Sequence, residues 1–133
     1  MNRKIKFKGL AEETKRWIYG DLIQYDSGEV AILNRFTKYG YEATEIINRI
    51  KVIPETIGQY IGTNDKNKVE LYEGDKCKVI RYDWDNYYED SWGVDHPDEI
   101  EDEIVITFDL KYDFELQSNY DMSTLEKIGN IHE

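Results

Sequence analysis

The chain has 133 residues, 40% of them hydrophobic and 34% charged, with a formal net charge of −11. This length predicts one domain with one modest core, and the eleven Tyr, four Phe and three Trp argue against a disordered chain. The acidic balance disfavours nucleic-acid binding, and no run approaches the roughly 20 apolar residues of a membrane span. The first residues lack the apolar core of a signal peptide, so we expect a cytoplasmic protein.

The first third of the chain predicts short strands. Residues 3–8 alternate basic and apolar side chains, which is the period of a half-buried strand with one solvated face. A second strand is expected at 17–25, with a bend or bulge at Gly20 and Asp21, and a third at 30–33 after a turn. Together these elements predict a β-meander.

Residues 41–50 carry a helical pattern. Apolar side chains fall at the i, i+3, i+4 and i+7 positions of one helical face, at Ala43, Ile46, Ile47 and Ile50. A helix this short does not hold in isolation. We therefore expect it to dock its apolar stripe against the sheet.

The stretch 52–75, VIPETIGQYIGTNDKNKVELYEGD, predicts a hairpin with its own turn residues. Pro54 cannot donate to a sheet ladder and marks a strand entrance or edge. Turn residues at 64–67 separate two extended segments, and the Glu-Gly-Asp run at 73–75 needs glycine for a backbone angle that other residues resist. Strand, Glu-Gly-Asp, strand is typical of small SH3-like barrels. The single cysteine, Cys77, leaves no internal disulfide, and we expect it at an ordinary strand position.

The segment from Tyr82 to Leu110 contains eleven acidic residues and no Lys or Arg, so the rest of the chain is electrically balanced. It shows no clear helical or strand period and predicts an acidic loop at about 83–103. Aromatic rings set among carboxylates suit contact with a basic protein. The candidate interaction surface consists of Trp84, Asp85, Tyr87, Tyr88, Glu89, Asp90 and Trp92. Alternation resumes at Ile104 and predicts a strand that continues to Leu116.

Five blocks of residues occur in one order along nearly the whole chain. They are RKIKFKG at 3–9, WIYGD at 17–21, PETIGQYIG at 54–62 followed by Asp65-Lys66-Asn67, YEGD at 72–75, and IGNIHE at 128–133. Together they resemble the YopX family, small proteins typical of phages and prophages of Gram-positive bacteria. The resemblance implies a mainly β pseudobarrel capped by one helix, which agrees with the helix expected at 41–50. It implies no defined biochemical activity.

The resemblance also marks a set of signature positions with structural roles. They are Gly20, Asp21, Pro54, Thr56, Gly58, Tyr60, Gly62, Tyr72, Glu73, Gly74, Asp75, Gly129 and Asn130. Family members typically have Gly where this chain has Lys68, which leaves the type of the hairpin turn open. No catalytic, cofactor-binding or metal-binding residue is carried over.

The residues themselves indicate little chemistry. His96 stands beside Asp95, Asp98 and Glu99, and imidazole with carboxylates can bind a divalent metal. Adjacent loop residues diverge, however, so a solvated loop is the favoured interpretation. The sequence has no phosphate-binding glycine loop, nucleophile elbow, Cys/His pair or HExxH motif. We therefore assign no catalytic residue, cofactor or metal.

Several functions remain open. The leading hypothesis is a non-catalytic protein–protein interaction module whose acidic, aromatic loop contacts a partner, expected to be basic. The second is a small ligand-binding or enzymatic β-barrel that uses Glu73 and Asp75 in a concave site. The third is a nucleic-acid mimic that inhibits a DNA-binding host protein. A purely architectural hypothesis is a homo-oligomer in which an edge strand pairs with its twin.

Overall fold

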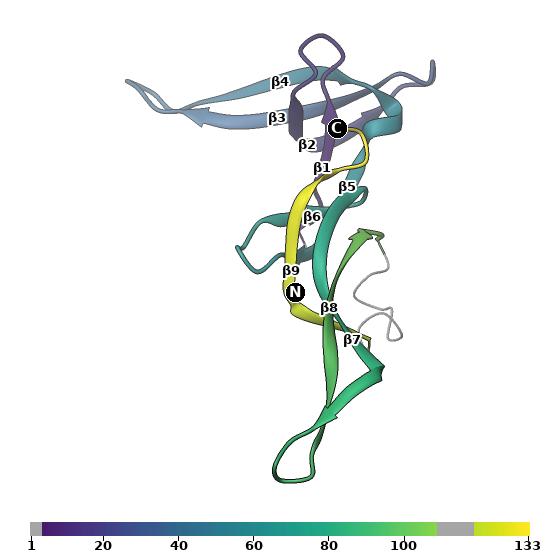
Figure 1. Cartoon of the computed structure of the whole chain (residues 1–133). Coiled ribbons are helices and arrows are strands. Elements are labelled where there is room, and N and C mark those ends of the chain that lie inside the picture. The colour runs from purple at the N-terminus through teal and green to yellow at the C-terminus, as the bar shows by residue number, and fades with distance from the viewer. Residues whose placement is uncertain (1–3, 109–118) are drawn as a thin grey trace. The chain divides into compact units, whose positions relative to one another are not determined.

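The computed structural model describes residues 4–108 and 119–133, where nearly all regular structure is β-strand (Figure 1). A short 3-10 helix, η1 (Pro54–Thr56), follows the fourth strand. The strands are β1 (Phe7–Leu10), β2 (Trp17–Gln24), β3 (Val30–Lys38), β4 (Thr44–Val52), β5 (Gly58–Asn64), β6 (Glu70–Tyr72), β7 (Asp75–Glu89), β8 (Asp95–Val105) and β9 (Tyr120–Asn130). The length predicts one domain; contacts within the chain define two compact units, unit 1 up to Gly62 and unit 2 from Thr63 onward.

Unit 1 is an antiparallel sheet with the strand order β4-β3-β2-β1-β5. The strands predicted at 17–25 and 30–33 are confirmed as β2 and β3. Alternating side chains of neighbouring strands point to the same face of a sheet and bury it together. The core formed in this way consists of Val30, Ile32 and Val52, against which Phe7, Ile18, Leu22 and Ile57 pack.

The lysines of the N-terminal strand lie over aromatic rings. Nζ of Lys8 is 4.4 Å from the centroid of the Trp17 ring, and Nζ of Lys6 is 5.7 Å from that of Tyr19. Lys8 is fully buried, so it departs from the solvated face that the alternation at 3–8 predicts. An ammonium over a ring face is attracted by the ring quadrupole, which offsets part of the cost of burial.

β2 changes partner at the point where the sequence predicts a bend. It pairs with β1 up to Gly20 and with β3 from Asp21 onward. A Cβ on Gly20 would lie 2.0 Å from the carbonyl oxygen of Leu33, so the backbones approach more closely there than any side chain allows. This explains why glycine occupies the position.

The helix predicted at 41–50 is wrong, because residues 44–50 lie in strand β4 and residues 41–43 precede it. β3 and β4 form a long hairpin in which Ile50 lies opposite Ile32. Ile46 and Ile50 are half-buried on one face, whereas Ile47 is 53% exposed. β-Branched side chains pack well on a pleated surface, and nine cross-strand pairs stabilise an extended conformation that the helical spacing cannot match.

The predicted pseudobarrel does not close, since both sheets are open across residues 4–108 and 119–133. Unit 1 comes nearest to closure where Ala11 forms an isolated bridge with Val52 and the Ile53 N–H donates to the Leu10 carbonyl. The chain enters η1 directly afterwards, so this contact does not extend into a ladder.

Unit 2 contains the three-stranded antiparallel sheet β8-β7-β9. Asp75, Cys77 and Val79 of β7 are buried and alternate with more exposed residues. Cys77 therefore occupies the ordinary strand position that the sequence predicts. Gly74 has a φ of +88°, which confirms that the Glu-Gly-Asp turn needs a backbone angle suited to glycine.

The acidic loop predicted at about 83–103 is wrong for most of its length. β7 runs to Glu89 and β8 begins at Asp95, which leaves a turn of only a few residues between them. Aromatic residues favour strands, and acidic side chains are tolerated there when they point to solvent. The strand predicted from Ile104 onward is wrong at residues 106–108, because β8 ends at Val105 and these residues are not in a strand; the rest of that prediction, at 109–116, lies outside the described residues.

The turn at 65–69 is anchored by Asp65. Its Oδ1 accepts the N–H groups of Asn67 (2.8 Å) and Val69 (2.9 Å), and its Oδ2 accepts the N–H of Lys127 in β9 (3.0 Å). Burial acts to raise the pKa of Asp65, but these three donors outweigh it and hold the pKa below its usual value. Lys68 has a φ of +66°, a left-handed conformation that favours glycine, so the turn keeps the geometry that a glycine at this position would adopt.

Replacing Lys68 by glycine is expected to stabilise the protein. A non-glycine residue in the left-handed region costs about 1 kcal/mol, part of which the greater chain entropy of glycine offsets. We expect a gain of about 0.5 kcal/mol, measured as a higher urea midpoint. Asn67→Gly, at a neighbouring position without a positive φ, is the control and should lower the midpoint. An unchanged or lower midpoint for Lys68→Gly would contradict the explanation.

Candidate functional site

The acidic hairpin, residues 82–99, is formed by the end of β7, the turn after it and the beginning of β8 (Figure 1). β9 pairs with β7 between Asp75 and Arg81, and beyond Arg81 the strand partner of β7 within the described residues is β8. The hairpin carries seven carboxylates and no Lys or Arg. It is thus a two-stranded, negatively charged extension of the sheet of unit 2.

A bulge in β7 interrupts the hairpin. Asp83 pairs with Asp98, and the next pair is Tyr87 with Pro97, so residues 84–86 have no cross-strand partner in β8. The Asp83 carboxylate folds them back, because it accepts the Asp85 N–H (3.1 Å) and the Asn86 side-chain amide (2.9 Å). These bonds, with that of the Asn86 side chain the largest contribution, lower the pKa of Asp83. The bulge presents Trp84 and Asp85 outside the ladder.

Four aromatic side chains of the hairpin stand in solvent. Their exposed fractions are 58% for Trp84, 58% for Tyr87, 59% for Tyr88 and 90% for Trp92. Asp85 and Glu89 are exposed beside them. The residues predicted as an interaction surface therefore lie together on one hairpin with their rings accessible.

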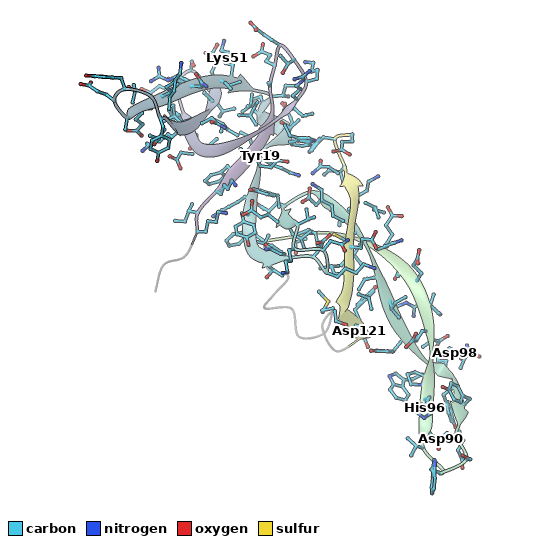
Figure 2. All side chains as sticks on the ribbon, turned by 90° about the vertical axis from the view of Figure 1, so that its left-hand side faces the viewer. Tyr19, Lys51, Asp90, His96, Asp98 and Asp121 are labelled. Carbon is cyan, nitrogen blue, oxygen red and sulfur yellow. The ribbon has the colours of Figure 1, made fainter. Side chains whose placement is uncertain are left out.

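The end of the hairpin is fixed by Asp90. Its Oδ1 accepts the N–H groups of Trp92 (2.8 Å) and Val94 (3.0 Å), and its Oδ2 lies 2.8 Å from Nε2 of His96. The His96 ring stacks on Tyr88 with the centroids 5.0 Å apart. Figure 2 shows His96 and Asp90 close together at this end of the hairpin. The backbone that carries Trp92 is therefore held in one shape.

Acid is expected to loosen this turn. The bond from His96, followed by the N–H of Val94, lowers the pKa of Asp90 below its usual value of about 3.9. The stabilisation is complete above that value and is lost as pH falls through the lower folded pKa. The protection of the Trp92 and Val94 amides from exchange, relative to the intrinsic rate at each pH, should therefore fall as the pH drops from about 4 through the folded pKa. Asp90→Asn keeps a carbonyl acceptor but cannot ionise, so its protection should not change over this range, and an identical acid response in that variant would contradict the assignment.

Arg81, just before the hairpin begins, forms an ion pair within the sheet. Nε of Arg81 lies 3.5 Å from Oδ2 of Asp102, which also accepts the hydroxyl of Tyr120 (2.9 Å). The N–H of Glu103 and then the Tyr120 hydroxyl lower the pKa of Asp102. Arg81 thus forms an ion pair with Asp102 in the sheet and also acts electrostatically on Asp83 at the base of the hairpin.

The surroundings of His96 bear on metal binding at this residue. Across residues 4–108 and 119–133 there is no group of three or more His, Cys, Asp or Glu placed to hold a metal ion. The imidazole instead bonds to Asp90 and stacks on Tyr88. His96 therefore acts in shaping the turn.

The signature positions of unit 1 shape its backbone. Thr56 Oγ1 accepts the N–H of Leu10 (2.9 Å) and donates to the carbonyl of Ile53 (2.6 Å), which ties η1 to β1. Pro54 is the first residue of η1, not of a strand. The other signature positions of unit 1 lie in β2 and β5 and are Gly20, Asp21, Gly58, Tyr60 and Gly62.

Two distant signature blocks meet in unit 2. Asp75 is fully buried; its Oδ2 accepts the Tyr72 N–H (2.8 Å) and its Oδ1 accepts the side-chain amide of Asn130 (3.0 Å). Nζ of Lys127 lies 3.7 Å from the same Oδ1. The N–H of Ile131 donates to the carbonyl of Gly74 (3.0 Å), and Gly129 precedes Asn130 in β9. YEGD and IGN thus form one buried polar cluster.

This cluster bears on the hypothesis of a concave site at Glu73 and Asp75. Both oxygens of the Asp75 carboxylate already accept structural hydrogen bonds, and no surface of Asp75 reaches solvent. A catalytic or ligand-binding carboxylate must meet its substrate. The geometry therefore favours a structural role for Asp75.

A groove in unit 1 was not predicted from the sequence. It has a volume of about 820 Å³ and lies between the turn at 11–16 and strands β2, β3 and β4. Its lining residues are far apart in the chain and come together only through the order of the strands. No local motif could have revealed it.

The described helical residues include no segment long and apolar enough to cross a membrane. Comparison with curated proteins and with solved structures gave no match. The family model described as "YopX protein" matches residues 6–133. Because this match covers nearly the whole chain, including both signature blocks that meet at Asp75, the chain belongs to the YopX family.

Proposed function

We propose that this protein is a phage- or prophage-encoded, non-catalytic interaction module that binds a basic protein through the acidic hairpin, in the cytoplasm of a bacterial host. The observation that carries the proposal is the exposure of Trp84, Tyr87, Tyr88 and Trp92 on a hairpin with seven carboxylates and no Lys or Arg. Membership of the YopX family supports a phage setting, and the hairpin supports the kind of contact.

Exposed aromatic rings suit the centre of a protein interface. Trp and Tyr bury a large area at low entropic cost, and both are enriched among residues that dominate binding energy. Their exposure in the free protein has no structural benefit, because apolar surface in water is unfavourable. A partner that covers Trp84, Tyr87 and Trp92 would recover this free energy.

The negative charge of the hairpin favours a partner with a basic surface. Carboxylates around the rings steer a positively charged surface toward the hairpin and repel an acidic one. Arg81 pairs with Asp102 and acts on Asp83 at the base of the hairpin, but residues 82–99 themselves contain no Lys or Arg to balance their seven carboxylates. The attraction is between exposed charges and should weaken as salt is raised.

The outer edge of β8 argues against self-association through this hairpin. Glu99, Glu101 and Glu103 alternate along this strand and are exposed. Pairing with a twin strand would bring like charges opposite one another, which destabilises a sheet. The partner of the hairpin is therefore a different protein.

The proposal is tested by affinity capture from host lysate with matched variants. Trp84→Ala/Tyr87→Ala/Trp92→Ala should lose a basic protein that the parent protein retains. The control, Tyr39→Ala/Tyr41→Ala, removes two exposed aromatic residues that lie outside the hairpin and should capture it normally. The captured protein should then bind in purified form with an affinity that falls with salt.

Charge is tested in the same way. Asp85→Asn/Glu89→Gln/Asp95→Asn removes three negative charges from the hairpin and spares Asp90, which holds the turn. Glu42→Gln/Glu45→Gln/Glu55→Gln removes three elsewhere. Equal capture by both charge variants, or by both aromatic variants, would overturn the proposal. If DNA displaces the captured partner, the hairpin acts as a nucleic-acid mimic; if DNA has no effect, that narrower function is excluded.

A further inference from the structure

The groove of unit 1 has the build of a small-molecule site. Its floor is apolar, formed by Ile18, Ala31 and Ile50 with the ring of Tyr25 beside them. Its volume of about 820 Å³ lies within the range of roughly 300–1,000 Å³ that is typical of ligand pockets. The turn on its rim is fixed to the sheet, because the Glu12 N–H donates to the carbonyl of Lys51 (3.0 Å). The groove is therefore preformed.

The rim carries six charged residues. Two of them form an ion pair with each other, and the other four, called open side chains, do not. Nζ of Lys51 lies 3.1 Å from Oε1 of Glu29, so these two charges satisfy each other (Lys51 is labelled in Figure 2). The open side chains are those of Glu12, Glu13, Arg16 and Arg49. None of these four forms an ion pair within 4 Å in the described parts of the chain, although Glu12, after Glu29, helps to raise the pKa of Lys51. Two carboxylates and two guanidinium groups thus border an apolar floor.

We propose that this groove binds a zwitterionic ligand with an apolar body, the chemistry of an apolar amino acid or a short apolar peptide. A guanidinium fork matches a carboxylate with two parallel hydrogen bonds, which suits Arg16 and Arg49 to the acidic end of the ligand. Glu12 and Glu13 accept hydrogen bonds from its ammonium. The floor at Ile18 covers its apolar part.

The balance of charge decides between ligand classes. The rim has three acidic and three basic side chains, although the whole chain has a net charge of −11. A polyanion such as a nucleotide would place phosphates near Glu12 and Glu13, and a polycation would meet Arg16 and Arg49. A ligand with one charge of each sign satisfies both kinds of side chain. The site lies wholly in unit 1 and is independent of the acidic hairpin.

The test titrates the full chain with four probes, followed by amide chemical shifts. They are the tripeptide Leu-Ala-Leu with free ends, its N-acetylated form, its C-amidated form, and free leucine. The free tripeptide should shift the amides of Ile18, Ala31 and Ile50, and blocking either end should weaken binding about 5-fold. Tighter binding of leucine than of the tripeptide would identify the amino acid as the natural source of this chemistry, and the reverse a peptide.

Matched variants assign each end of the ligand. Arg49→Gln should weaken the free tripeptide but not the amide, and Glu12→Gln/Glu13→Gln should weaken the free tripeptide but not the acetylated form. Lys38→Gln and Glu42→Gln/Glu45→Gln, which make the same charge changes outside the groove, should have no effect. The inference is overturned if no probe shifts these amides up to about 10 mM, or if blocked and free tripeptides bind equally.

Discussion

Gly20→Ala is expected to prevent unit 1 from folding or to destabilise it by about 4 kcal/mol. The added Cβ would lie 2.0 Å from the carbonyl oxygen and 2.9 Å from the carbonyl carbon of Leu33. Both atoms belong to the backbone of the neighbouring strand, so the clash cannot be relieved by a side-chain rotation. The strands β2 and β3 would have to separate where they begin to pair.

The matched control is Gly40→Ala. A Cβ on Gly40 meets nothing within 4 Å, so this variant should differ from the parent by less than about 0.5 kcal/mol. Thermal unfolding followed by circular dichroism compares the three proteins, and amide exchange at Leu22 and Ile32 locates the change in unit 1. Equal stability of the two alanine variants would mean that the close approach at Gly20 is absent.

Asp75→Ala is expected to destabilise the protein by about 3 kcal/mol. The carboxylate is fully buried and accepts the Tyr72 N–H and the Asn130 amide, so its removal leaves two buried donors without an acceptor. Lys127 also loses the negative charge that lies 3.7 Å from its Nζ. Both losses act in the folded state, because water satisfies these groups in the unfolded chain.

Two further variants separate burial from charge. Asp75→Asn keeps one carbonyl acceptor and should cost less than Asp75→Ala. Asp95→Ala removes an exposed carboxylate of the same unit and should cost less than about 0.5 kcal/mol. Urea unfolding gives all three values. If Asp75→Ala were no worse than Asp95→Ala, Asp75 would not hold the two signature blocks together.

The sequence predicted the strands at 17–25 and 30–33, the glycine turn at 74 and the strand position of Cys77, because each depends on neighbouring residues. The first strand was misplaced, since the alternation at 3–8 predicts it there and it lies at Phe7–Leu10. The helix at 41–50 failed for the opposite reason. Spacing of Ile46, Ile47 and Ile50 fits a helical face, but cross-strand pairing with β3 is worth more than local periodicity. Such pairing cannot be read from one segment alone.

The prediction of an acidic loop at about 83–103 was wrong for a related reason. Its bulge after Asp83 shifts the register, so no single period-2 pattern runs through β7. The exposure of Trp84 and Trp92 is observed, while their role in binding stays a prediction. The bond between Asp75 and Asn130 joins residues 55 positions apart, and the groove of unit 1 needs four segments in one order; neither has a local signal.

The acidic hairpin is joined to the sheet of unit 2 at its base, so its length can vary independently of that sheet. Among the residues that the structure describes, β9 pairs with β7 as far as Arg81, and the β7–β8 pairs beyond Asp83 make no contact with the buried cluster around Asp75. The hairpin can therefore gain or lose whole residue pairs without altering the sheet beneath it. A change in the length of the hairpin beyond Asp83 is therefore expected to leave the buried cluster around Asp75 intact, while it would alter the surface that carries Trp84 and Trp92.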